Sequence, residues 1–246
     1  MTYTPKKGFW LTDSSVPTAE IIAGLGFDFV VLDFEHGMFD LRNLEYFIPV
    51  LKGMGLQAWV KVLAPTQEAI QQPLDFGADG VIIPHVTNAK HAATVSAYAK
   101  FPPLGERSLS GGRPFGYAAC TTDQVQKINT EISCFPLIEH PLAVRDIQEI
   151  ADLPCVDGFQ MGPGDLALMS GRGAYSQSIE DWADANQCVN AFKRAGKPWL
   201  FPAWTEAEQR WALDKEAPLI MIGMQFGLLR KAISQAKEAF DILSIR

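Results

Sequence analysis

The sequence of 246 residues contains no segment typical of a membrane protein or a secreted protein. No apolar run approaches the roughly 20 residues that cross a bilayer. Residues 1–15 include two lysines but neither an apolar block nor a small-residue cleavage pattern, so we expect no secretory signal. The four cysteines, Cys120, Cys134, Cys155 and Cys188, show no paired spacing, which argues against a disulfide framework or a zinc site. These absences predict a cytoplasmic protein without a membrane partner.

Basic residues are scarce as well. Lysine and arginine number 21 against 28 aspartates and glutamates, which gives a formal net charge of −7. Because such a surface repels phosphate backbones, we expect no nucleic-acid partner. The hydrophobic fraction of 48% is ordinary for a globular protein. Since α/β barrels reach about 250 residues as one domain, we expect a single domain over residues 1–246.

The common nucleotide-binding and hydrolase motifs are missing. The turn after the first apolar run, LTDSSVP at 11–17, has no Gly-x-Gly, and no Walker sequence occurs. No Gly-x-Ser-x-Gly is present, and no cysteine lies beside a histidine. Covalent hydrolase chemistry is therefore disfavoured.

What the sequence does contain is a repeated alternation of short apolar runs and longer segments of helical character. Continuous apolarity is typical of strands that are covered on both faces of a parallel sheet. Gly26, Gly77 and Gly196 suit left-handed helix stops before the following strands. Eight strands alternating with about eight helices predict an α/β fold, the TIM (β/α)8 barrel, with a doubly wound open sheet as the competing interpretation. The runs are 8–11, 29–32, 58–62, 80–83, 134–138, 158–161, 198–201 and 219–222, and a long Pro/Gly/Ser-rich loop interrupts the pattern at 101–117.

In a TIM barrel the active site lies at the carboxyl ends of the strands. Polar residues follow the second, fourth, fifth and sixth runs, and a lysine lies within the third. The seventh and eighth runs end in apolar residues at 201–204 and 221–224. We therefore expect a polar mouth with an apolar wall opposite. Its polar residues are Asp33, Glu35, His36, Lys61, His85, Glu139, His140 and Asp165, the last preceded by Gly162, Pro163 and Gly164.

Glu139 and Asp165 are the candidate metal ligands. Two carboxylates without thiolates form a hard-oxygen site suited to Mg²⁺ or Mn²⁺. The alternative is that each carboxylate caps the following helix, because both lie at strand-to-helix turns. Their joint position after adjacent strands favours the metal.

His36 is the candidate general base, because an imidazole pKa near ~6.5 suits proton transfer at neutral pH. A hydrogen-bonded loop histidine would look the same in the sequence. Asp75, near the end of the third helix, could orient a histidine, although the sequence by itself is more typical of a surface carboxylate.

Five sequence blocks occur in the order found in a known family. They are GFDFVVLDFEHG at 26–37, PLDFGADGVIIPHV at 73–86, FPPLGER at 101–107, PLIEH at 136–140 and VDGFQMGPGDL at 156–166. With these blocks the chain resembles the HpcH/HpaI family of class II, metal-dependent 2-oxo acid aldolases, from about residue 8 to about residue 240. The resemblance implies a TIM barrel of the phosphoenolpyruvate/pyruvate-binding type. It also implies a lyase that cleaves or forms a 4-hydroxy-2-oxo acid through the enolate of pyruvate, with an aldehyde as the second partner.

The resemblance assigns roles to individual residues. Glu139 and Asp165 match carboxylates that bind Mg²⁺ or Mn²⁺, with Co²⁺ as a third candidate, and the cation would stabilise the enolate. His36 matches the catalytic histidine, and Asp75 matches the aspartate that pairs with it.

Three further groups have supporting roles by resemblance. Backbone N–H groups at 162–165 would bind the substrate carboxylate. Asp33 and Glu35 would support His36 and the metal-bound waters.

Two residues depart from the family pattern. Lys61 stands where the family has an arginine that contacts the enolate oxygen, so it keeps the charge but loses the planar, two-pronged donor. We expect Lys61 to bind substrate and take part in catalysis. His140 replaces the usual serine or threonine beside the metal glutamate, and the loop after Arg107 differs, so the aldehyde is not specified. Lys61 keeps open decarboxylation or hydrolysis of a related 2-oxo acid, and the alternative outside the enzymes is a non-catalytic barrel that binds a small acid.

The family forms hexamers in which the C-terminal helix packs against a neighbouring subunit. The segment 226–244 of this chain carries a matching apolar stretch, and we expect a homo-oligomer, a hexamer by resemblance, with this helix exchanged. A helix that packs on its own barrel would have the same composition. The apolar residues include Leu228, Leu229, Ile233, Ala236 and Phe240.

Overall fold

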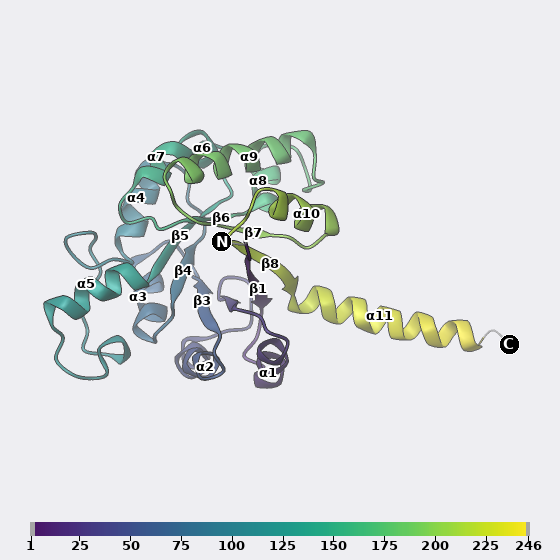
Figure 1. The fold of residues 1–246 in the computed structure, drawn as a ribbon, viewed down its shortest axis with the longest axis horizontal. Coiled ribbons are helices and arrows are strands. Elements are labelled where there is room, and N and C mark those ends of the chain that lie inside the picture. Colours follow the sequence, from purple (N-terminus) through teal and green to yellow (C-terminus); the bar gives the residue numbers. More distant parts are fainter. Residues whose placement is uncertain (1–2, 245–246) are drawn as a thin grey trace.

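The eight apolar runs form the eight strands of one closed parallel barrel (Figure 1). The computed structural model describes residues 3–244, so the ends of the expected 1–246 domain lie outside the described residues. Strands adjacent in sequence pair in parallel from first to last, and the eighth pairs with the first. The predicted TIM barrel is confirmed, with each run within two residues of its strand. The strands are β1 Lys6–Leu11, β2 Phe29–Asp33, β3 Gln57–Lys61, β4 Gly80–Ile83, β5 Ser133–Ile138, β6 Phe159–Met161, β7 Trp199–Pro202 and β8 Leu219–Met224.

Helices cover the outside of the barrel, and most of them begin at a side-chain cap. Ser15, Thr66 and Ser178, for example, each accept a hydrogen bond from the backbone N–H three residues on. The predicted helix stops Gly26, Gly77 and Gly196 have φ values of 74°, 96° and 68°. The helices are α1 Val16–Gly24, α2 Leu41–Gly53, α3 Gln67–Asp75, α4 Ala89–Ala97, α5 Thr122–Glu131, α6 Pro141–Arg145, α7 Ile147–Asp152, α8 Pro163–Met169, α9 Ile179–Arg194, α10 Glu206–Asp214 and α11 Gln225–Ser244, and a 3₁₀ turn Arg113–Phe115 lies within the long loop.

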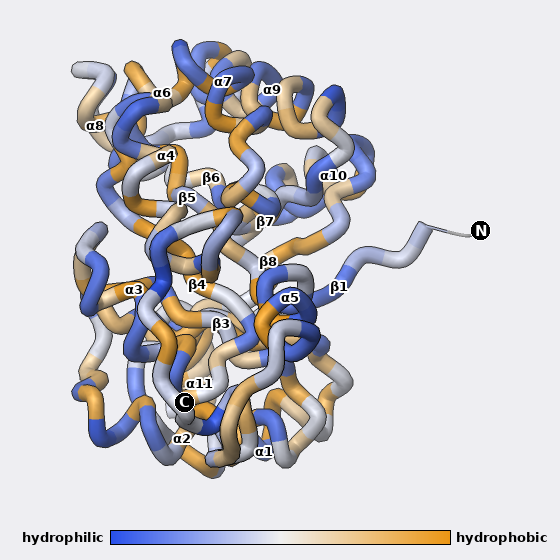
Figure 2. Tube along the Cα trace, turned by 90° about the vertical axis from the view of Figure 1, so that its left-hand side faces the viewer, coloured by the Kyte–Doolittle hydropathy of each residue, from blue (hydrophilic) through white to orange (hydrophobic). Residues whose placement is uncertain are grey.

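Alternation along the strands sorts their side chains between two cores. Figure 2 shows hydrophobic residues concentrated in the strands and mixed residues along the surrounding helices. One core lies between strands and helices, and the second fills the barrel. Val31, Trp59 and Leu137 point into the barrel. Because side chains alternate, the next inward-pointing residue on each of these strands lies two positions later, nearer the carboxyl end. The barrel interior contains Trp10, Phe29, Val31, Trp59, Ile82, Phe135, Leu137, Leu200, Leu219 and Met221.

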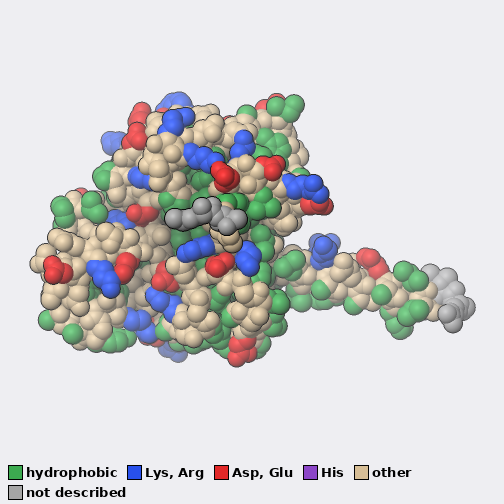
Figure 3. Space-filling model, viewed as in Figure 1, with side chains coloured by type: hydrophobic (Ala, Val, Ile, Leu, Met, Phe, Trp, Pro, Cys, Tyr) green, Lys and Arg blue, Asp and Glu red, His purple; other side chains and the backbone are tan. Residues whose placement is uncertain are grey.

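The last helix, α11, extends away from the barrel instead of packing along it (Figure 1). None of its 20 residues is buried, and Figure 3 shows hydrophobic side chains along its surface. Its first residue is anchored to the end of β1, because the N–H and hydroxyl of Thr12 both donate to Oε1 of Gln225 at 2.9 Å. No helix of residues 3–244, this one included, is long and apolar enough to cross a membrane.

Candidate active site

The polar residues expected after the strands come together at the carboxyl end of the barrel. The inward positions after Val31, Trp59 and Leu137 are Asp33, Lys61 and Glu139, and all three are buried. They lie at or beside a cavity of about 220 Å³. The cavity is lined by Trp10, Lys61, Leu137, Glu139, Gln160, Met161, Gly162, Pro163, Gly164, Asp165, Tyr175, Pro202 and Trp204.

Glu35 is the centre of the charged contacts at this mouth. Its side chain is only 8% exposed, and its Oε2 forms an ion pair with Nζ of Lys61. Its Oε1 lies 2.6 Å from Nε2 of His85, and its Oε2 lies 3.5 Å from Nε2 of His36. One carboxylate therefore contacts the lysine and two histidines, and it fixes Lys61 near the cavity.

Glu139 is the buried carboxylate of the site. Its Oε1 accepts a hydrogen bond of 2.6 Å from the backbone N–H of His85, whose φ of 60° is unusual for a residue other than glycine. Burial raises the pKa of Glu139, and the negative charge of Asp165 adds to this; the His85 N–H and the positive charge of Lys61 act against it. Glu139 is thus a partly desolvated carboxylate that a cation would stabilise.

Asp33 holds the turn that carries Glu35 and His36. Its Oδ1 accepts from the backbone N–H of His36 at 3.0 Å, and its Oδ2 accepts from Nε1 of Trp10 at 3.0 Å. Trp10 in turn lies under the lysine, with its ring centroid 5.9 Å from Nζ of Lys61. Asp33 therefore orders the backbone of the site and is not itself free to act on a substrate.

The segment 162–165 forms the start of α8. The Gly162 N–H donates to the carbonyl of Ile138 at 2.9 Å, and Pro163 has no N–H. The first turn leaves Gly164 and Asp165 without intrahelical acceptors, so these two residues supply the N–H groups that can face a ligand. His140, expected beside the metal glutamate, caps α6, since its Nδ1 accepts from the N–H of Leu142 at 3.2 Å.

The expected pair of His36 and Asp75 is not formed within the chain. Asp75 is the last residue of α3, and a helix that follows a barrel strand runs back toward the amino end. Asp75 therefore lies at the opposite end of the barrel from His36, where Oδ1 accepts from Nη2 of Arg107 at 2.7 Å. The carboxylate nearest to His36 is Glu35 instead.

Pro202 and Trp204 line the cavity, where the apolar wall at 201–204 was expected. Three other residues of the cavity wall were not anticipated from the sequence. Trp10 and Gln160 lie within strands, and a strict inward–outward count along β1 and β6 would have identified them. Tyr175 lies in a connecting segment, for which no periodic signal exists. Gln160 is notable because it is 3% exposed and its Oε1 has no hydrogen-bond partner within the described residues.

Comparison with known proteins identifies the family to which this chain belongs. The family model for HpcH/HpaI aldolase/citrate lyase matches residues 6–224. The chain belongs to this family. Its curated relatives include a 5-keto-4-deoxy-D-glucarate aldolase of Klebsiella pneumoniae, 30% identical over 235 residues, which cover 95% of this chain and 91% of the relative. A 2-dehydro-3,6-dideoxy-6-sulfogluconate aldolase of Pseudomonas putida is 32% identical over 67% of this chain, and the match spans 65% of that relative, slightly under two thirds of its length.

Solved structures agree with the fold of this HpcH/HpaI protein. An HpcH/HpaI aldolase from Desulfitobacterium hafniense superposes with a TM-score of 0.89 at 26% identity, covering 96% of this chain and 93% of that one. The protein is an aldolase, a carbon–carbon lyase, as its named relatives are.

Proposed function

We propose that this aldolase uses a divalent cation and makes or breaks the C3–C4 bond of a 4-hydroxy-2-oxo acid, with pyruvate as the oxo-acid half. The observation that carries the proposal is the buried carboxylate of Glu139, whose pKa is raised by burial, at a cavity that Asp165 also lines. Residues 3–244 contain no cluster of three or more His, Cys, Asp or Glu that could hold a metal. Two carboxylates suffice, because Mg²⁺ or Mn²⁺ completes its shell with water and substrate oxygens; Co²⁺ is a third candidate.

Gly162 supports the fit of a cation beside Glu139. A Cβ atom at position 162 would lie 2.8 Å from Cβ of Glu139 and 3.2 Å from its Oε2. Glycine therefore keeps the space next to this oxygen open. When bound, the cation would supply Lewis-acid stabilisation of the substrate's oxo group.

Protein groups are proposed to bind the oxo acid and to stabilise its negative charge. The N–H groups of Gly164 and Asp165 would hold the substrate carboxylate, and Gly162 and Pro163 shape the turn that presents them. Lys61, which is 5% exposed, would stabilise the negative charge that develops on the oxo oxygen. In a site that excludes water such a fixed charge is more effective than in solution. Glu35 contributes by holding Nζ of Lys61 in place.

His36 is proposed to move the proton of the C4 hydroxyl group. During cleavage it would remove this proton, and during addition it would return it. Its side chain is 65% exposed, so a substrate can reach it, and Oε2 of Glu35 lies 3.5 Å from its Nε2 to stabilise the protonated ring. The family resemblance pairs Asp75 with His36. Because the two lie at opposite ends of one barrel, that pair would have to form between subunits.

The exposed helix α11 supports a homo-oligomer. Apolar residues recur along it at alternating spacings of three and four, which is the pattern of a helix that packs against another helix. They are Phe226, Leu229, Ile233, Ala236, Phe240 and Leu243, and the large ones among them are 47–69% exposed. We propose that this stripe, residues 226–243, packs against a second copy of the chain in a hexamer.

Introducing a charge into this stripe should dissociate the assembly. Ile233→Asp is expected to reduce the mass measured by light scattering after size exclusion to that of a smaller species, because an unpaired carboxylate would be buried at the contact. Ser234→Asp adds the same charge one residue away, off the stripe, and should leave the mass unchanged. An unchanged mass for Ile233→Asp would contradict the proposed role of α11.

A cytoplasmic location is also proposed. The four cysteines are free in the structure, and Cys134 and Cys188 are fully buried. Free thiols of this kind persist in a reducing compartment.

Proton exchange of pyruvate tests the proposed function without knowledge of the aldehyde. In D₂O with Mg²⁺, the purified protein is expected to replace the methyl protons of pyruvate by deuterium, seen as loss of the proton NMR signal. Mn²⁺ is followed by mass spectrometry, since it broadens NMR lines, and EDTA should stop the exchange. Absence of exchange with every cation would contradict the proposal. Release of CO₂ from an oxo acid, or tight binding without turnover, would then support the decarboxylase or the binding barrel.

A further inference from the structure

The mouth of the barrel has a second, aromatic side that the proposed chemistry leaves unused. Trp10 on β1, Tyr175 between α8 and α9, Pro202 at the end of β7 and Trp204 just after it all line the cavity that contains Lys61 and Glu139. We call these four residues the aromatic side. The charged residues that contact Glu35 and Glu139 come from β2 to β5 and the segments that follow them, so the two sides belong to different parts of the barrel.

Two of the polar side-chain atoms of the aromatic side, on Trp10 and Tyr175, are already engaged by carboxylates. Nε1 of Trp10 donates to Oδ2 of Asp33 at 3.0 Å. Burial, together with the charge of Glu208 and a hydrogen bond to it, raises the pKa of Tyr175, so the hydroxyl stays protonated and directed to that carboxylate. Glu208 is 1% exposed and accepts from the N–H and the hydroxyl of Thr205 at 2.8 and 3.0 Å. This side therefore presents ring surface, with a negative charge behind it.

Positive charge is scarce in the cavity. Among the described residues that line it, Lys61 is the only basic side chain, and it is paired with Glu35. A carboxylate or sulfonate at the far end of a substrate needs an arginine, a lysine or N–H groups as partners. The substrates in the names of the two relatives carry such a group, a carboxylate in one and a sulfonate in the other. The aromatic side provides no basic partner for it.

We propose that the aldehyde half of this enzyme's substrate carries a neutral, apolar side group, preferably an aromatic ring, and no second acid group. The inference rests on the proposed function, which supplies the pyruvate half. In the addition direction of the aldol reaction, C3 of pyruvate loses a proton and bonds to the aldehyde carbon. The aldehyde oxygen takes up a proton and becomes the C4 hydroxyl. The side group of the aldehyde would then pack against Trp204, a residue that is 42% exposed and would become covered. A terminal carboxylate would instead face aromatic rings and the charge of Glu208.

Aldol addition with three aldehydes tests this inference. Pyruvate, Mg²⁺ and the full-length protein are combined with benzaldehyde, succinic semialdehyde or D-glyceraldehyde, and the adducts are quantified by mass spectrometry. We expect kcat/KM for benzaldehyde to exceed that for succinic semialdehyde by about tenfold or more. Equal or better use of succinic semialdehyde or glyceraldehyde would overturn the inference. Pyruvate exchange without aldehyde separates the two failures: exchange without this preference leaves the proposed function standing, whereas no exchange removes both.

A positive charge placed on the aromatic side should weaken or abolish the preference for benzaldehyde. Trp204→Arg is expected to lower the ratio of benzaldehyde to succinic semialdehyde kcat/KM by about tenfold, because the new guanidinium can pair with the terminal carboxylate. Leu25→Arg adds the same charge at the exposed end of α1, at the opposite end of the barrel, and should leave the ratio unchanged. A ratio that moves equally in both variants, or in neither, would overturn the assignment of this side to the aldehyde.

Discussion

Glu139→Gln should abolish cation-dependent exchange of pyruvate, with a fall of at least about 10²-fold in the rate. The amide keeps the size of the carboxylate and can still accept the hydrogen bond from the His85 N–H, but it carries no charge to hold a cation. Without metal, the variant should unfold at a temperature equal to or higher than that of the unmodified protein. Burial raises the pKa of Glu139, and the neutral amide removes the cost of desolvating its charged carboxylate.

A matched control separates this effect from a general loss of surface charge. Glu206→Gln makes the same chemical change on α10, where the side chain is 75% exposed and forms an i, i+4 pair with Arg210. This variant should retain the rate of the unmodified protein. An exchange rate of Glu139→Gln within about twofold of that of the unmodified protein would contradict the proposed cation site, since a fall of at least about 10²-fold is expected.

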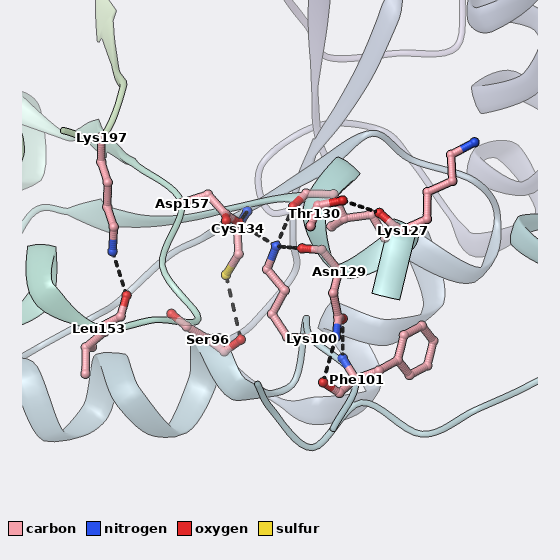
Figure 4. A network of polar contacts seen from close by, with 11 residues as sticks. Ser96, Lys100, Phe101, Lys127, Asn129, Thr130, Cys134, Leu153, Asp157 and Lys197 are labelled. Atoms are coloured by element: carbon pink, nitrogen blue, oxygen red, sulfur yellow. Dashed lines mark hydrogen bonds and ion pairs between the residues drawn. The ribbon is translucent and has the colours of Figure 1, made fainter. Parts of the chain in front are cut away.

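Lys100→Met should lower the free energy of unfolding by about 3–5 kcal/mol. Lys100 is 1% exposed, and its Nζ donates to the carbonyls of Asn129 and Ile132 at 2.7 and 2.6 Å (Figure 4). It also pairs with Oδ2 of Asp157 at 2.7 Å. Burial raises the pKa of Asp157, and Lys100 opposes that rise. Methionine would leave two carbonyls without their donor, and it would leave the Asp157 carboxylate with only the N–H of Cys134 and no counter-charge in contact.

This loss can be measured by urea unfolding alongside a surface control. Lys127→Met on α5 removes an ion pair with Glu131 in which the lysine is 69% exposed, and it should cost about 0.5 kcal/mol or less. Adding Asp157→Asn to Lys100→Met should recover part of the stability, because the carboxylate that lost its counter-charge is replaced by a neutral amide. A cost below about 1 kcal/mol for Lys100→Met would mean that the network does not hold the end of α4 to α5.

The barrel was predictable because its signal is repeated eight times. Each strand is covered on both faces, so it is visible in the sequence as a continuous apolar run, whichever strands it pairs with. The glycines at 26, 77 and 196 mark where helices end. The position of α11 was not predictable. An apolar stripe spaced by three and four residues is the same whether a helix covers its own barrel or that of a neighbour, and the choice depends on the rest of the assembly.

The site was predictable to the extent that its residues lie at, or shortly after, the carboxyl ends of strands. Asp33 ends β2, Glu139 directly follows β5 and Asp165 lies in the first turn after β6, and topology then brings them to one end. Asp75 illustrates the limit of this reasoning: a resemblance gives its partner, but the direction of α3 places it at the other end of the molecule. Tyr175 lies ten residues beyond Asp165, where neither periodicity nor topology indicates that the chain returns to the cavity.

The division of the mouth has a consequence for how the enzyme can diversify. The carboxylates and Lys61 come from β2 to β6, whereas Tyr175 and Trp204 belong to segments outside the barrel that tolerate exchange without disturbing strand pairing. With the roles proposed above, bond-making chemistry and acceptor choice would be encoded in separable stretches of the gene. Trp10 is the exception, because it contacts both Asp33 and Lys61. Libraries that vary the α8–α9 and β7–α10 segments while keeping β1 intact would explore new aldehydes at little risk to the reaction itself.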